Sequence, residues 1–236
     1  MLKAIQQELA NLASPSRAIK SAHYFRTGTQ LAGTVDIYRG VAVPEIRRIA
    51  KANKEISIND LAKLAKSKFH DERLCALIIL NHKFDKATSD VERIDYFEFW
   101  LDLLRSNRVN NWDLIDTSAP VMGKILARHL GYNAEFLHGL AKSEVLWERR
   151  AAILLTFALI RINKFGPTLA IARDLLNDKE DLIHKAVGWM LREVGNRDQE
   201  KLTEFLNKYK TQMPRTMLRY AIEKYSPKQR AAFMAR

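Results

Sequence analysis

The sequence predicts an all-α protein, a curved α-solenoid of HEAT-like helix pairs stacked as an α-α superhelix. Apolar residues recur at helical spacing along most of the 236 residues. Nine Gly and six Pro residues are about half the average share. Neither Asn-Gly nor Asp-Gly, the usual hairpin turns, occurs in the chain. This shortage of turn residues argues against β-sandwiches and barrels.

An internal repeat gives the solenoid its expected period. The segment 72–79 (ERLCALII) superposes on 148–155 (ERRAAILL) with an offset of 76 residues, twice 38. Two helices and their short turns fill a period near 38 residues in HEAT-like units. Chance similarity between two apolar helices is the alternative.

Chemically distinctive residues follow the same period. Trp112 lies 38 residues after Leu74, and Trp189 lies 39 residues after Arg150. Equivalent positions of a solenoid stack along one face. The repeat therefore predicts that these four residues line one concave surface.

The helices are expected in the following order. A first amphipathic helix carries the apolar stripe Leu2, Ile5, Leu9 and Leu12, and residues 26–40 form the longest irregular segment. Pro44 then begins a helix, because proline suits the first helical turn. Further helices are predicted at residues 58–67, 71–82, 90–105, 111–130, 133–142, 145–162, 167–176, 180–194, 198–210, 214–225 and 227–235. No linker-like stretch divides the chain, so residues 1–236 are interpreted as one domain.

The net charge predicts a polyanionic partner. Thirty-nine Lys and Arg residues against 27 Asp and Glu leave a charge of +12. This excess favours nucleic acid or an anionic membrane surface. The most apolar stretch, residues 151–160, is bracketed by arginines and is about half the length of a membrane span. The N-terminus carries charge too early for a signal peptide, so a cytoplasmic protein is expected.

Metal and cofactor sites are not expected. A single cysteine, Cys75, excludes a disulfide framework, and its apolar neighbours favour a buried thiol. The six histidines are scattered without an i,i+4 pair. Gly28 and Gly33 have the spacing of a phosphate-binding loop but lack its lysine, and are interpreted as an ordinary loop.

Trp112 and Asp116 form the most distinctive pair. At i,i+4 they share one helix face, one turn apart. A carboxylate beside an aromatic ring can bind and stabilise a positively charged group. The alternative is a core tryptophan with Asp116 capping or bridging a neighbouring segment.

Arg150 and Trp189 are weaker candidates. Arg150 interrupts an otherwise apolar helix, and a plain surface charge is the alternative. Trp189 follows Gly188, which would let another group approach the helix closely. The alternative is a buried tryptophan. Trp100 and Trp147 have no such neighbours and are assigned to packing.

The sequence resembles the bacterial DNA alkylation-repair glycosylases built from HEAT-like repeats, the AlkD type. The resemblance runs from about Tyr24 to Tyr225. It is carried most strongly by WDLID (112–116), WERRAAI (147–153) and KAVGWMLRE (185–193), and more weakly by GVAVPEIR (40–47) and RTMLRYAIE (215–223).

The resemblance assigns roles to individual residues. It places Trp112, Asp116 and Trp189 at the family's active-site positions. Arg150 falls on its basic cleft residue, and Tyr24 matches a cleft tyrosine. The resemblance also places Arg47 at a backbone-contacting position. From the excess of positive charge we expect phosphate contacts by a set of cations, Arg47, Arg150, Lys185 and Arg192.

The function implied is that of a monofunctional, metal-independent DNA glycosylase. It would hydrolyse the N-glycosidic bond of positively charged N3- or N7-alkylated purines in duplex DNA, without a cofactor. The resemblance also implies a bacterial, nucleoid-associated protein, and we expect a monomer. The alternative is a non-catalytic HEAT-like scaffold that binds bent or branched DNA, or a protein partner.

Overall fold

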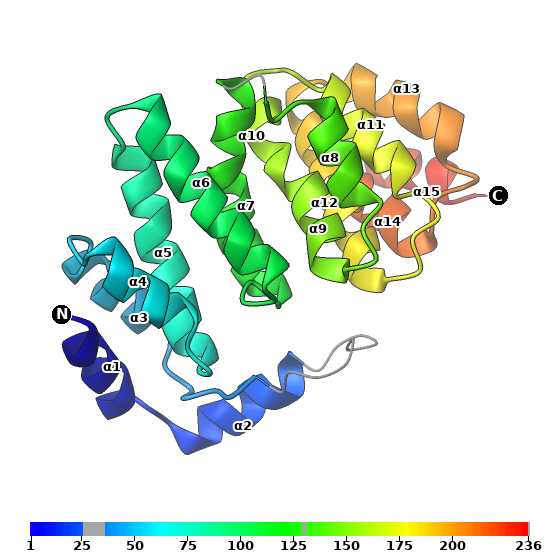
Figure 1. The fold of residues 1–236 in the computed structure, drawn as a ribbon. Coiled ribbons are helices and arrows are strands. Elements are labelled where there is room, and N and C mark those ends of the chain that lie inside the picture. The colour runs from blue at the N-terminus through cyan, green and yellow to red at the C-terminus, as the bar shows by residue number, and fades with distance from the viewer. Residues whose placement is uncertain (26–35, 129–130, 236) are drawn as a thin grey trace. The chain divides into compact units, whose positions relative to one another are not determined.

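The fold is all-α, as predicted. The structure, a computed structural model, describes residues 1–25, 36–128 and 131–235. Helices make up almost all the regular structure of these residues (Figure 1). Their β-structure is limited to an isolated parallel bridge between Ile37 and Phe69. The predicted loop with Gly28 and Gly33 lies outside the described residues.

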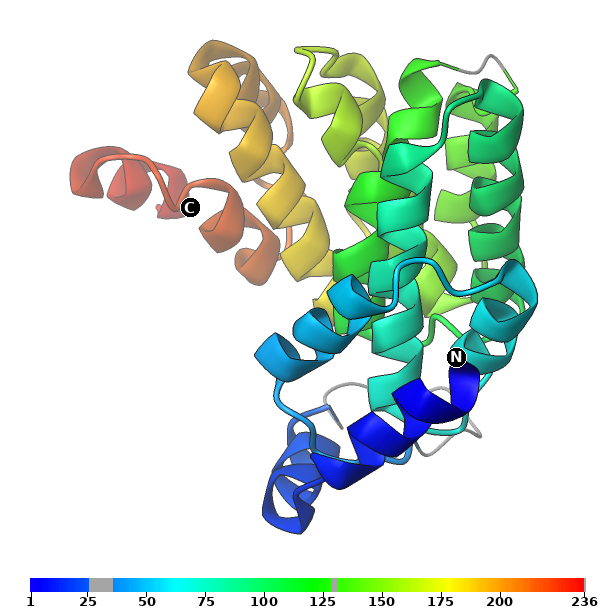
Figure 2. The same cartoon turned by 90° about the vertical axis from the view of Figure 1, so that its left-hand side faces the viewer.

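The chain packs into two compact units, Met1–Met122 and Gly123–Arg236. The helices of the first unit are α1 (Leu2–Asn11), α2 (Pro15–Tyr24), α3 (Val43–Ala52), α4 (Ile58–Ala65), α5 (His70–Lys86), α6 (Asp90–Arg105) and α7 (Trp112–Met122). α5 is central: α3, α4, α6 and α7 all pack against it (Figures 1 and 2). Trp100 is completely buried in this unit, and its indole N–H donates to Ser118 at 2.8 Å, which confirms its assignment to packing.

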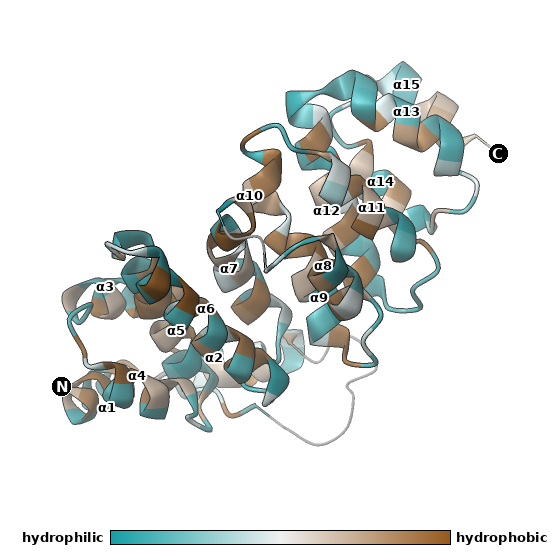
Figure 3. Ribbon diagram, turned by 45° about the horizontal axis from the view of Figure 1, so that its top comes forward, coloured by the Kyte–Doolittle hydropathy of each residue, from teal (hydrophilic) through white to brown (hydrophobic). Residues whose placement is uncertain are grey.

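The second unit is arranged around α12. Its helices are the 3₁₀ helix η1 (Gly123–Ala127), α8 (Ala134–Ala141), α9 (Leu146–Leu155), α10 (Phe157–Ile160), α11 (Gly166–Asp174), α12 (Asp181–Arg197), α13 (Gln199–Tyr209), α14 (Arg215–Ala221) and α15 (Pro227–Met234). α12 packs against α9, α13 and α14. α2 of the first unit and α15 of the second consist only of exposed and half-buried residues, and Figure 3 shows hydrophilic residues along both. The single-domain interpretation of residues 1–236 stays a prediction.

Three helices differ from the expectation. α2 was not predicted, although Ser14 caps it by accepting the N–H of Arg17 at 3.5 Å and Pro15 fills its first turn. The predicted helix 111–130 ends at Met122 and continues as a 3₁₀ turn, because Pro120 cannot donate a helical hydrogen bond. The predicted helix 145–162 divides at Thr156, whose hydroxyl donates to the carbonyl of Ile153 at 2.6 Å.

The internal repeat is visible in the hydrogen bonds. Arg73 on α5 donates to the carbonyl of Ser67 at 3.0 Å, and Arg149 on α9 donates to that of Ser143, also at 3.0 Å. The hydroxyls of both serines accept a backbone N–H two residues later, at 3.1 and 3.0 Å. Each arginine also pairs with an aspartate, Asp36 or Asp178. The 76-residue offset therefore relates two copies of one local structure, not two helices alike by chance.

The register of the four repeat residues is less regular. Leu74 and Arg150 are each the fifth residue of their helix, whereas Trp112 is the first residue of α7 and Trp189 the ninth of α12. The two tryptophans are therefore displaced by about one turn, in opposite directions. Leu74 and Arg150 are also both buried, each 4% exposed.

Gly188 allows α12 and α14 to pack closely. A Cβ atom at this position would lie 2.5 Å from the Cβ of Tyr220 and 2.6 Å from the carbonyl oxygen of Met217. The group that approaches the helix at Gly188 is thus a neighbouring helix of the same unit.

Replacing Gly188 with Ala is expected to lower the free energy of unfolding by about 1–3 kcal/mol, because backbone must move to relieve the overlap. Gly139→Ala is the matched control. Gly139 lies inside α8 with nothing within 4 Å of an added Cβ, so helix propensity should stabilise that variant by about 0.5–1 kcal/mol. Urea unfolding measures both, and equal effects would contradict the packing argument.

Candidate active site

The start of α7 carries the predicted pair Trp112 and Asp116. Asn111 accepts the backbone N–H of Trp112 at 2.8 Å, which satisfies a donor at the helix start. Trp112 and Asp116 follow one turn apart on one face, and both are half-buried. The carbonyl of Asp116 would normally accept the N–H of residue 120, which is proline and has none.

Trp112 belongs to a group of rings, here called the aromatic cluster: Tyr24, Phe25, Tyr38, His70 and Trp112. Phe25 lies 5.4 Å from Trp112 and stacks on Tyr38 at 5.4 Å with an interplanar angle of 4°. Tyr24 meets Trp112 edge to face at 6.0 Å and remains 61% exposed. The cluster joins the end of α2 to the starts of α5 and α7, so several contacts fix the orientation of the Trp112 ring.

His70 links the aromatic cluster to two carboxylates. Its Nδ1 lies 3.0 Å from Asp36 and its Nε2 lies 2.8 Å from Asp113, which follows Trp112 directly. Arg73 pairs with Asp36 at 2.5 Å. Burial opposes the charged imidazolium, but the two carboxylates outweigh it and raise the pKa of His70 to about 9. His70 is therefore a buried cation at neutral pH.

The first turn of α5 also binds the segment that leads into α3. Asp71 accepts the backbone N–H groups of Arg39 at 2.7 Å and Val41 at 2.8 Å. Glu72 pairs with the Arg39 guanidinium at 2.6 Å. The charged start of α5, HDER at residues 70–73, is entirely buried. This network was not predicted from the sequence. Its signal in the sequence was the run of four titratable residues at the start of a core helix.

Trp189 lies in the second unit and is half-buried on α12. Its indole N–H donates to Glu193 at 3.0 Å, and the ring of Phe157 packs 6.2 Å away. The contacts of Trp189 are thus with its own unit, and those of Trp112 with the first. Their predicted convergence on one concave surface stays a prediction.

The predicted DNA-binding cations differ in their surroundings. Arg47 on α3 is exposed and forms no ion pair with the residues that the structure describes. Lys185 pairs with Asp181 at 2.8 Å, and Arg192 pairs with Glu223. Arg150 is buried and donates to the carbonyl of Leu182. Arg47 therefore offers its charge most freely to a phosphate.

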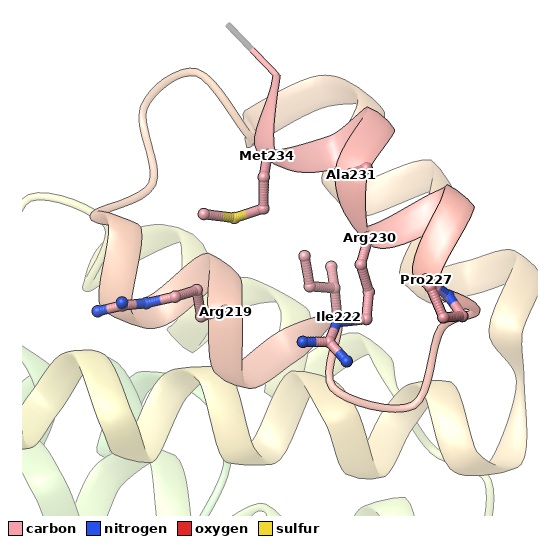
Figure 4. A pocket seen from close by; sticks show the side chains of 6 residues that line it. All are labelled: Arg219, Ile222, Pro227, Arg230, Ala231 and Met234. Carbon is pink, nitrogen blue, oxygen red and sulfur yellow. The ribbon is translucent and has the colours of Figure 1, made fainter.

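A further pair of cations lines a surface cavity of about 390 Å³ between α14 and α15. The lining residues are Arg219, Ile222, Pro227, Arg230, Ala231 and Met234 (Figure 4). Figure 4 shows the side chains of Arg219 and Met234 pointing the same way, with the Arg230 guanidinium near Ile222. The cavity adds exposed positive charge beside an apolar floor to the second unit.

The described residues offer little for thiol or metal chemistry. Cys75 is completely buried, which raises the pKa of its thiol to about 12 and confirms its assignment to the core. Within residues 1–25, 36–128 and 131–235, His, Cys, Asp and Glu form no group of three placed to hold a metal ion. In the same ranges, no helix combines the length and hydrophobicity needed to cross a bilayer. The absence of a metal cofactor stays a prediction.

Comparison with known families identifies the chain. The family model described as DNA alkylation repair enzyme matches residues 5–225. The chain belongs to this DNA alkylation repair enzyme family. Membership confirms the resemblance carried by the motifs around Trp112, Trp147 and Trp189.

Solved structures share the fold of this family member. A predicted DNA alkylation repair enzyme from Enterococcus faecalis matches with a TM-score of 0.69 at 16% identity, covering 91% of this chain and 97% of that one. AlkD2 from Streptococcus mutans matches with a TM-score of 0.56 at 16% identity, covering 89% and 99%. Among curated proteins, no sequence matches significantly. At these identities the structures show a common AlkD-type fold.

Proposed function

We propose that this DNA alkylation repair enzyme is a monofunctional, metal-independent glycosylase. Its substrates are purines alkylated at N3 or N7 in duplex DNA, and it acts as a monomer. The observation that carries the proposal is the half-buried face of α7, where Asp116 lies one turn from a tryptophan oriented by the aromatic cluster.

The chemistry of the lesion matches this residue set. An N3- or N7-alkylated purine carries a positive charge, and it departs as a neutral base without protonation by a general acid. One carboxylate can therefore suffice, in contrast to the carboxylate pair of sugar glycosidases. Asp116 stabilises the oxocarbenium-like sugar and orients the attacking water. The faces of Trp112 and Trp189 attract the cationic nucleotide, each by about 0.5–2 kcal/mol.

Selectivity follows from the same charge. A normal purine is uncharged, so the carboxylate and the two aromatic faces have no cation to attract. Its glycosidic bond is also stronger and stays intact. Duplex binding rests on phosphate contacts, which carry no sequence information. Arg47 supplies such a contact, and α3, with Pro44 in its first turn, adds a helix N-terminus suited to an anion.

The decisive experiment counts released bases. The protein is incubated with duplex DNA containing N7-methylguanine, and free base is measured against time and against DNA alone. Enzyme-dependent release supports the proposal. Tight binding to the same duplex without release would overturn it and favour the scaffold that binds bent or branched DNA or a protein partner.

Binding should depend steeply on salt. Replacing Arg47 with Ala is expected to weaken binding to undamaged and alkylated duplexes alike, because a phosphate contact is lost. The slope of log K against log salt should become shallower by about 0.9, the value for one contact. Arg105→Ala on α6, also exposed, is the matched control and should leave the slope unchanged. Salt-independent binding by the wild type would contradict the proposed interface.

A further inference from the structure

Trp189 is held by a carboxylate at the edge of its indole ring. The indole N–H donates to Oε1 of Glu193 at 3.0 Å, across one turn of α12. The second carboxylate oxygen, Oε2, accepts the side-chain amide of Asn196 at 3.2 Å. Glu193 is half-buried, as Trp189 is. The carboxylate is thus fixed by two donors.

Both groups that donate to Glu193 are neutral, so neither compensates the negative charge of its carboxylate. The neighbouring cation, Arg192, pairs with Glu223 instead. Among the described residues, Glu193 forms no ion pair that would cancel its charge. The Glu193 carboxylate therefore lies at the N–H edge of the indole ring without a paired cation among the described residues.

This arrangement changes what the ring attracts. A hydrogen bond to an ionised acceptor is roughly twice as strong as one to a neutral acceptor. Such a bond draws positive charge toward the N–H and leaves the ring face more electron-rich. The attraction of a cation to an indole face is electrostatic, so it grows with the negative potential of that face. A neutral base of the same shape gains much less.

We propose that Glu193 determines specificity by acting through Trp189, strengthening the binding of a positively charged base relative to a neutral base of the same shape. This inference rests on the proposed function, because it assigns Trp189 to the lesion. Glu193 touches Trp189 and not the reacting atoms, so it is a positioning residue. Its carboxylate acts at the ring edge, and that of Asp116 acts on the sugar.

The test compares two duplexes that are not cleaved. One carries N7-methylguanine with a 2′-fluoro sugar, which is cationic and resists hydrolysis, and the other carries 7-methyl-7-deazaguanine, a neutral base of nearly the same shape. The variant Glu193→Gln keeps an oxygen that accepts the indole N–H and removes the charge. The measured quantity is the ratio of the two Kd values.

The wild type is expected to prefer the cationic duplex, and Glu193→Gln should reduce that preference by about 3- to 10-fold, within the range of one cation–π contact. Affinity for the neutral duplex and the Tm should stay unchanged. Glu204→Gln on α13 removes a carboxylate that pairs with Lys201 at 3.0 Å and serves as the matched control with an unaltered ratio. Glu193→Ala, which also frees the indole N–H, should weaken binding to both duplexes.

Two results would overturn the inference: a Glu193→Gln variant with the wild-type ratio, or a wild type that binds both duplexes equally. Failure of the proposed function gives a different pattern. In that case the wild type does not release N7-methylguanine, whatever the ratio of the Kd values. The base-release assay and the binding ratio therefore report on the two statements separately.

Discussion

Replacing Asp116 with Asn should slow the release of N7-methylguanine by about 10- to 1000-fold, equivalent to about 1.4–4 kcal/mol of transition-state stabilisation. The amide keeps the shape of the side chain and removes its charge, which acts on the positive charge that develops on the sugar. A cationic purine already departs slowly unaided, so the loss should fall toward the lower part of this range. Affinity for the duplex should change little.

Single-turnover release under saturating enzyme measures this effect without interference from product dissociation. Asp102→Asn on α6 is the matched control, because Asp102 is exposed and the substitution is the same. Both variants should show the wild-type Tm. The Asp116 variant should not gain activity on neutral lesions such as uracil. Release by Asp116→Asn at the wild-type rate would remove this carboxylate from the mechanism.

Helices whose local signals agree with the hydrophobic pattern could be predicted from the sequence. α6 begins at Asp90, where Ser89 accepts the N–H of Glu92 at 3.1 Å, and it ends at Arg105 as expected. α2 escaped prediction because its apolar side chains remain exposed, Ile19 by 72%, and so they form no inward-facing stripe. The hydrophobic pattern of a sequence reveals only those helices that bury one face.

The site could be predicted only in part, for a related reason. The i,i+4 spacing of Trp112 and Asp116 is local, so helical geometry places them on one face of α7. His70 meets Asp36 and Asp113 across 34 and 43 residues of chain. Such a pairing depends on tertiary packing and leaves no periodicity to detect. Arg150 shows the same limit, because only the structure reveals its bond to the carbonyl of Leu182.

The pH dependence of stability should reveal the buried His70 cation. An unfolded histidine has a pKa near 6.5, and the folded-state pKa of about 9 lies above it. Between these values the native state binds more protons than the unfolded state. The ion pairs of His70 with Asp36 and Asp113 are here called the His70 bridge. The stability that this bridge contributes is therefore fully present below pH 6.5 and is lost as pH rises through about 9. The bridge also holds the pKa of Asp36 below its usual range, against the effect of burial.

Replacing His70 with Ala should lower the free energy of unfolding at pH 6.5 by about 3–5 kcal/mol, because the half-buried carboxylates of Asp36 and Asp113 lose the buried cation between them. Asp36 keeps its ion pair with Arg73. His138→Ala is the matched control: it removes a histidine that also pairs with an aspartate, Asp174, but lies partly exposed. That pair should contribute about 0–1 kcal/mol.

Urea unfolding between pH 6 and 9.5 separates the effects of the two substitutions. Wild-type stability should fall across this range, whereas the His70 variant should lose most of that slope. A His70 variant that keeps the wild-type slope would show that another group carries the alkaline loss, and that the contacts of His70 with Asp36 and Asp113 do not hold its charge in the folded state.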